Sequence, residues 1–322
     1  MSKSKIFRSK IFNISLFLMG LILCIILPKT KVLNPYITQV LIYIGINIII
    51  TVSLNIVNGY MGEFSLAHGG FMAIGAYISS ILSISLLKSP WFFPLNMLIG
   101  GVVAAFAGFL VAIPSFKTRG DYFALITLGF SLVVKSLFEN IQSLGGARGI
   151  AGIPRFTDLS WVYITVVLVL ILTRNIIYSN FGRGLISIRE DEIASELSSV
   201  NTKNLKTIAF VTSAFFTGIA GSLFAHTLMF INPSAFGITR ITEGLVMVYL
   251  GGIGSITGSI IGATIWTILI EALRGLGIWK WVIGPFLLII LMLYRRTGIM
   301  GLKELNFIIP EREKLGETYE SQ

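Results

Sequence analysis

The chain has 322 residues, of which 54% are hydrophobic and 12% are charged, and its formal net charge is +10. Its mean hydropathy of +0.85 lies outside the usual range of soluble domains. Long apolar runs recur along most of the chain with few ionisable residues inside them, so we expect lipid to be its solvent. This composition excludes a soluble enzyme.

Ten apolar segments follow one another along the chain and predict an all-α, polytopic transmembrane helical bundle. They cover residues 11–27, 36–57, 64–87, 91–113, 121–138, 160–178, 207–230, 241–254, 256–273 and 280–294. A full helical span needs about 20 apolar residues. Segment 241–254 is therefore short enough to be a half-helix or a re-entrant piece, while 11–27, 256–273 and 280–294 are marginal. We predict eight to ten membrane segments, the first of them an uncleaved anchor.

Positive charge is distributed unevenly between the connecting segments. With the N-terminus inside, fifteen Lys and Arg residues fall in inside segments and eight in outside segments, and Lys135 and Arg174 lie within spans. The outside residues are Lys29, Lys31, Lys88, Arg148, Arg155, Arg240, Arg274 and Lys280. Basic residues accumulate on the cytoplasmic side, so the tails 1–10 and 295–322 and the loop 179–206 are predicted to be cytoplasmic. The net charge is a topology signal and does not indicate nucleic-acid binding.

The sequence lacks the motifs of soluble catalysis. It has no phosphate-binding loop, and glycines 252, 254 and 258 miss the dinucleotide-binding spacing by one residue. Cys24 is the single cysteine, so no zinc, other metal or redox cofactor is indicated. Small residues recur every fourth position at glycines 254, 258 and 262, and again at Ala214, Gly218 and Ser222. This spacing favours close packing of membrane helices.

Ionisable residues at bilayer depth are costly and are candidates for function. Glu63 and His68 lie in a glycine-interrupted stretch, Asp121 precedes Tyr122 at the start of a span, Glu243 starts the eighth segment and Glu271 closes the ninth. The structural alternative is helix capping, since acids are stabilised at helix N-termini. We favour capping or packing for Asp121, whereas for Glu63 a structural turn and solute contact are equally plausible. His68 has the further alternative of a hydrogen bond to a neighbouring helix.

Two glycine-interrupted stretches echo each other in the two halves of the chain. Gly59, Gly62 and Ser65 precede one small-residue helix, and Gly251, Gly254 and Ser255 precede another. Paired interruptions of this kind are typical of transporters whose pathway runs along broken helices. The candidate pathway or broken-helix residues are Gly59, Gly62, Glu63, Ser65, His68, Asp121, Tyr122, Gly251, Gly254 and Ser255.

The longest inside loop carries a charged stretch at residues 182–201. Leu185, Ile188, Glu192 and Leu197 fall at roughly helical spacing, and charged residues occupy the other positions. We predict a short cytoplasmic helix here. It is either a solvated connector or a docking helix for another subunit, with apolar anchors and charges that set its register.

Four motifs in order resemble the permeases of branched-chain amino-acid ABC transporters, LivM type. They are GYMGEFSLAHGGFMAIGAY, TRGDYFALITLGF, GRGLISIREDEIASE and VMVYLGGIGSITGSIIGA. The resemblance covers residues 40–303 and implies a permease domain at 11–294. It also implies a second, homologous permease, two cytoplasmic ATP-binding subunits and an extracytoplasmic solute-binding protein, in a prokaryotic inner membrane.

In such importers the cytoplasmic loop helix is seated in a cleft of the ATPase, so the resemblance implies a set of coupling residues. These are Arg183, Arg189, Glu190, Asp191, Glu192 and Ala194. The chain departs from the family pattern at Ser199, where Gly is usual, and at Arg296, where Pro is usual. We expect Ser199 to lengthen or stiffen the loop helix, because Gly would end it more readily.

The family resemblance leaves the solute open. Leucine, isoleucine and valine are the first expectation, and related permeases serve urea and short amides. A carrier driven by an ion gradient would instead use Glu63, His68 or Glu271 as coupling groups, but the loop helix argues against it. A membrane-embedded enzyme would need a polar reactive cluster, which the sequence does not indicate.

Overall fold

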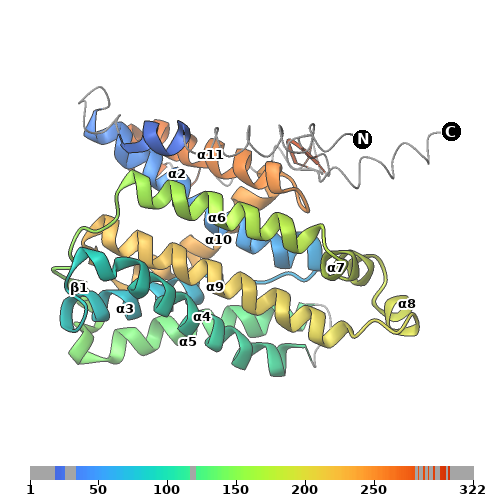
Figure 1. The fold of residues 1–322 in the computed structure, drawn as a ribbon. Helices are drawn as coiled ribbons and strands as arrows, with labels where there is room; N and C mark the ends of the chain where they lie inside the picture. Colours follow the sequence, from blue (N-terminus) through green and yellow to red (C-terminus); the bar gives the residue numbers. More distant parts are fainter. Residues whose placement is uncertain are drawn as a thin grey trace.

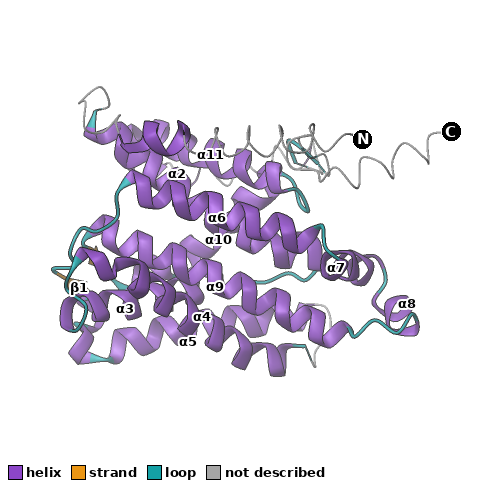
Figure 2. Ribbon diagram, viewed as in Figure 1, coloured by secondary structure: helices purple, strands orange, loops and turns teal. Residues whose placement is uncertain are grey.

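The computed structural model describes residues 19–25, 34–116, 121–279 and 298–301, and single residues 282, 286, 289, 293 and 304. Several predictions concern residues outside this part. They are those on the tail 1–10, on most of the first and tenth predicted segments, on most of the tail 295–322, and on Arg296. The described chain is helical almost throughout (Figure 2), which confirms the all-α prediction. The exceptions to helix include two strands of two residues, β1 (Ile150–Ala151) and β2 (Phe230–Ile231), which pair antiparallel in the register Ile150 to Ile231.

Six helical stretches in the described chain are long and apolar enough to cross a membrane. They are Pro35–Met61, Pro90–Ser115, Tyr122–Asn140, Leu159–Ile177, Thr202–Leu228 and Ile256–Gly275. The predicted number of eight to ten segments therefore stays a prediction. The eighth segment forms the 14-residue helix α10 (Ile238–Gly251), as short as its sequence indicated.

Two long helices form the core, α2 (Pro35–Asn55), continued by a π-helical turn (Ile56–Met61), and α9 (Thr202–Leu228). Their most apolar windows are 78% and 72% buried, against at most 39% in the other spanning helices. The outer helices therefore present their apolar residues to lipid, as expected of a bundle in a membrane.

The outer helices pack on this core in two groups (Figure 1). The first group comprises α3 (His68–Ser85) and α4 (Phe93–Ser115), both of which pack on α9, and α5 (Asp121–Asn140), which packs mainly on α3. The second comprises α10 and α11 (Ile256–Ala272), which pack on α2. The end of α2 meets the beginning of α9, so the two groups are arranged on antiparallel core helices. Helix α6 (Leu159–Ile177) covers α2.

Small residues allow the closest of these contacts, as their spacing predicted. A Cβ atom added to Gly75 of α3 would lie 2.0 Å from the carbonyl oxygen of Gly218 on α9, and Ser222 donates a hydrogen bond to the carbonyl of Gly75. On α11, a Cβ atom at Gly262 would lie 2.1 Å from the carbonyl oxygen of Met247. Both stripes are packing surfaces, as in other membrane helix pairs.

Helices α7 (Asn180–Glu190) and α8 (Glu192–Leu197) project at one end of the bundle, and β1 lies at the other (Figure 1). Short 3-10 helices occur in several of the connections and directly after α11. Their bounds are Pro90–Phe92, Gln142–Leu144, Gly146–Arg148, Pro233–Phe236 and Leu273–Trp279.

Candidate functional site

The loop between α6 and α9 forms two helices where the sequence predicted one. Ser179 accepts a hydrogen bond from the Gly182 amide at the start of α7, and Leu185 and Ile188 are buried. Asp191 interrupts the helix because its side chain accepts from the amides of residues 193 and 194, at 2.9 and 3.0 Å. An acid in this position is a strong N-cap, so it ends α7 and begins α8.

Ser199 follows α8 with a φ of +64°, in the left-handed region. Helix α8 already ends at Leu197, so Ser199 does not lengthen the loop helix, and the alternative that it stiffens this helix stays a prediction. Glycine would adopt this backbone conformation more easily than serine.

Helix α7 lies against the break at the end of α2. Gly62 has a φ of +80°, and a Cβ atom there would lie 2.7 Å from Cγ of Arg189. Arg189 donates from Nη1 to the carbonyl oxygen of Gly59, at 3.2 Å. It also pairs at 2.6 Å with Glu190, whose side chain is mostly exposed. The structure thus brings a residue of the predicted coupling set, Arg189, into contact with two predicted broken-helix residues, Gly59 and Gly62.

A second link between these segments is a buried lysine. Nζ of Lys206, near the start of α9, lies 2.6 Å from a carboxylate oxygen of Glu63 and 2.7 Å from one of Glu192. The Lys206 side chain is only 7% exposed. We call Gly59, Gly62, Glu63, Arg189, Glu192 and Lys206 the coupling clamp. It ties α8 and α7 to the point where α2 breaks.

The turn between α10 and α11 packs against the same break. Asn55 accepts from the amide of Gly254 at 2.9 Å and donates to the carbonyl of Ser255 at 2.9 Å. A Cβ atom on Gly59 would lie 2.5 Å from the Gly254 nitrogen. Gly251 closes α10 and touches Gly258. The two stretches that echo each other in sequence are therefore in contact.

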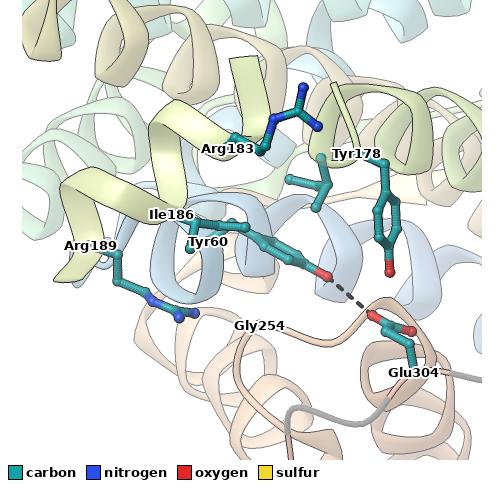
Figure 3. A pocket seen from close by; sticks show the side chains of 8 residues that line it. Tyr60, Tyr178, Arg183, Ile186, Arg189, Gly254 and Glu304 are labelled. Atoms are coloured by element: carbon teal, nitrogen blue, oxygen red, sulfur yellow. Dashed lines mark hydrogen bonds between the residues drawn. The ribbon is translucent and has the colours of Figure 1, made fainter. Parts of the chain in front are cut away.

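A pocket of about 210 Å³ opens between α7 and this break. Figure 3 shows Tyr60 and Tyr178 extending toward Glu304, with Arg183 and Arg189 supplied by α7. Tyr60 donates to Glu304 at 3.2 Å, and Glu304 also accepts from the amide and hydroxyl of Thr257 at 3.1 and 2.9 Å. Glu304 therefore caps α11, in the manner favoured by the helix dipole.

The remaining residues predicted from the sequence are not part of the coupling clamp. Ser65 donates its amide to Asn58 at 3.0 Å, and His68 shares a 2.8 Å hydrogen bond with Ser213 of α9. The bond to a neighbouring helix is the structural alternative predicted for His68. Asp121 begins α5, but its side chain is outside the described part, and Tyr122 is 68% exposed. Within the described residues no group of three or more His, Cys, Asp and Glu could hold a metal.

Sequence reasoning missed Lys206, Asn55 and Glu304. Lys206 was counted only as one inside charge, although a lysine followed by a long apolar helix could have marked a paired cation. Asn55 and Glu304 carried no local signal, since their partners lie 199 and 47 residues away.

A second charged cluster lies inside the bundle. Arg240, which was assigned to an outside segment, is on α10 and points inward, where Nη2 donates to Asn47 of α2 at 2.8 Å. Its Nη1 pairs with Glu243 at 2.7 Å. Arg240 therefore belongs to helix α10 and is mostly buried, whereas the sequence placed it in a connecting segment. Glu271, by contrast, pairs with Arg274 and accepts from Tyr36 among exposed groups.

Comparison with known proteins identifies a family of transport permeases. Residues 36–294 match the family model for the permease component of branched-chain amino acid transport systems. The chain is 28% identical to the high-affinity branched-chain amino acid transport permease LivM of Escherichia coli, over 91% of this chain and 75% of that protein. It is 28% identical to LivH of the same organism, over 80% and 91%. The ribose import permease RbsC of Haemophilus influenzae is 25% identical, over 80% and 84%. No solved structure gives a significant match.

Proposed function

The chain belongs to the family of permease components of branched-chain amino acid transport systems, and we propose that it carries leucine, isoleucine and valine through an ATP-driven importer. It is a multi-pass membrane permease and a transport subunit rather than an enzyme. The substrate proposal is supported by relatives named for branched-chain amino acids. The ribose permease among the relatives means that family membership alone does not determine the solute.

In this proposal two cytoplasmic ATPases supply the energy, and a second permease and an extracytoplasmic binding protein complete the importer. Helices α7 and α8 face the cytoplasm of a prokaryotic cell, as do both termini. The basic residues Arg183, Arg189, Lys203 and Lys206 at this end support that orientation.

The coupling clamp is the observation that carries the proposal. On α8, Ile193 and Leu197 are 61% and 84% exposed, although both are apolar. Exposed apolar residues ringed by charge are typical anchors for a partner, so these two would enter the ATPase, together with Ala194. A movement of α8 would then pass through Lys206 and Arg189 to the break in α2.

The test uses vesicles that contain the chain with its second permease, ATPases and binding protein. Leucine uptake should require ATP and persist without an ion gradient, and gradient-driven uptake by the chain alone would contradict the importer. Arg183→Glu and Leu197→Glu should reduce copurification of the ATPase. Lys203→Glu is the control, because Lys203 is exposed but lies outside α7 and α8, and it should leave copurification unchanged. Equal copurification of all three variants would count against docking at α7 and α8.

A further inference from the structure

The ion pair between Arg240 and Glu243 has no part in the coupling clamp. Both side chains are mostly buried, with exposed fractions of 13% and 15%. The guanidinium also lies 5.4 Å from the ring centre of Phe224, and its Nε is 3.4 Å from the sulfur of Met72. One cation and one anion are thus held side by side among apolar groups.

The pair lies at the middle of the membrane-spanning bundle. Asn47, which accepts from Arg240, is about 18 Å from the start of the helix Pro35–Met61 and about 21 Å from its end, at 1.5 Å per residue. Ionisable residues at this depth are rare and mark pathways. A buried ion pair is also a weak source of stability, because apolar residues of similar volume pack as well or better. Folding alone therefore gives little reason for these two charges.

The surroundings are those of a broken-helix site. A Cβ atom on Gly69, in the first turn of α3, would lie 2.7 Å from the carbonyl oxygen of Phe236, just before α10. The interruptions that precede α3 and α10 therefore meet beside the pair, and solutes bind where such interruptions meet. On α10, the exposed positions Thr239 and Thr242 are direct neighbours in sequence of Arg240 and Glu243.

We propose that Arg240 and Glu243 bind the zwitterionic head group of an amino acid as it crosses the membrane. This inference rests on the proposed function and deepens it. The guanidinium would receive the α-carboxylate through its two-pronged donor geometry, and the Glu243 carboxylate would receive the α-ammonium group. Each charge exchanges its present partner for one on the solute, so no charge is left unpaired and no proton moves.

The neighbours of Arg240 suit this exchange. Asn47 is itself anchored by a 2.8 Å hydrogen bond to Thr267, so it can hold the guanidinium when Glu243 turns to the solute. The face of Phe224 attracts the same cation. Met72 and Phe224 also offer the apolar surface that a branched side chain would contact.

The test compares variants of the complete importer in vesicles with ATP inside. Labelled leucine uptake, ATP hydrolysis and assembly are measured for Arg240→Gln, Glu243→Gln and the double variant Arg240→Gln with Glu243→Gln. The matched control is Arg274→Gln with Glu271→Gln, since this pair has the same i, i+3 spacing but Arg274 is 66% exposed. We expect each variant at 240 and 243, including the double, to lose at least about tenfold in leucine carried per ATP. The control should transport like the wild type.

The double variant separates solute binding from a structural role. A purely structural pair should tolerate neutralisation of both charges, because no unpaired charge remains, and transport near wild type would overturn the site. If the double variant does not assemble, Arg240→Glu with Glu243→Arg takes its place, because it keeps an ion pair, and the same tenfold loss is expected. Failure of the wild-type importer to carry leucine would instead overturn the proposed function, and the site with it.

Discussion

Removing the charge of Lys206 is the sharpest test of the coupling clamp. Lys206→Met keeps the length of the side chain but leaves Glu63 and Glu192 without the cation that lies 2.6 and 2.7 Å from them. Glu63 is 19% exposed, so we expect a loss somewhat below that of a fully buried pair, about 2–3 kcal/mol. Glu192 is 34% exposed, so solvent screening reduces its share to about 0.5 kcal/mol.

The loss at Glu63 corresponds to a roughly hundredfold increase in local opening of residues 62–67 from α9, and the loss at Glu192 to an increase of about twofold in opening of α8 from α9. Amide hydrogen exchange of residues 63–66 should accelerate accordingly in the complete importer, with a much smaller increase at residues 192–197, and leucine uptake per ATP should fall while ATP hydrolysis continues. Lys203→Met is the matched control, since Lys203 is exposed on the same turn. Equal exchange rates in the two variants would refute the reasoning. A double-mutant cycle with Glu63→Gln should give a coupling energy of about 2 kcal/mol.

Three further substitutions test the local structure. Ser199→Gly should stabilise the α8 region by about 1 kcal/mol, because Ser199 has a φ of +64°, and slower exchange at residues 195–201 would report it. Asp191→Ala should cost α8 about 1 kcal/mol through loss of its N-cap and speed exchange there, whereas Asp191→Asn should not. Gly75→Ala should abolish monodisperse protein in size-exclusion chromatography because its Cβ atom would meet the carbonyl of Gly218, while Gly129→Ala, with open space around it, should be tolerated. Normal behaviour of Gly75→Ala would contradict the close contact of α3 and α9.

Much of the fold could be predicted because it depends on local composition. The run 207–230 is apolar enough to be a spanning helix, and in the structure this helix begins earlier, at Thr202, and ends at Leu228. The shortness of the eighth segment and the packing role of the small-residue stripes also followed from length and spacing. The loop at 182–201 was recognised from its charge pattern, but its division at Asp191 was not, since the cap competes with a helical periodicity that continues through it.

The site could be predicted only in part. Arg189, Glu192, Gly59, Gly62 and Glu63 were singled out from two separate motifs, and nothing in either motif indicated that they touch. Their meeting depends on how α7 folds back against the end of α2. Arg240 was assigned to an outside segment because a charge count along the chain assumes that every residue between two spans lies at the surface.

The sequence alone determined that this protein is a membrane protein, that it is built of helices, and that a charged helical loop lies outside its membrane segments. Each of these follows from hydropathy and period within a window of about 20 residues. The tertiary structure decided that Lys206 joins Glu63, 143 residues away, and that Arg240 reaches Asn47, 193 residues away. A buried charge must find a partner wherever the fold supplies one, and which partner that is depends on the packing of distant helices rather than on neighbours in the chain.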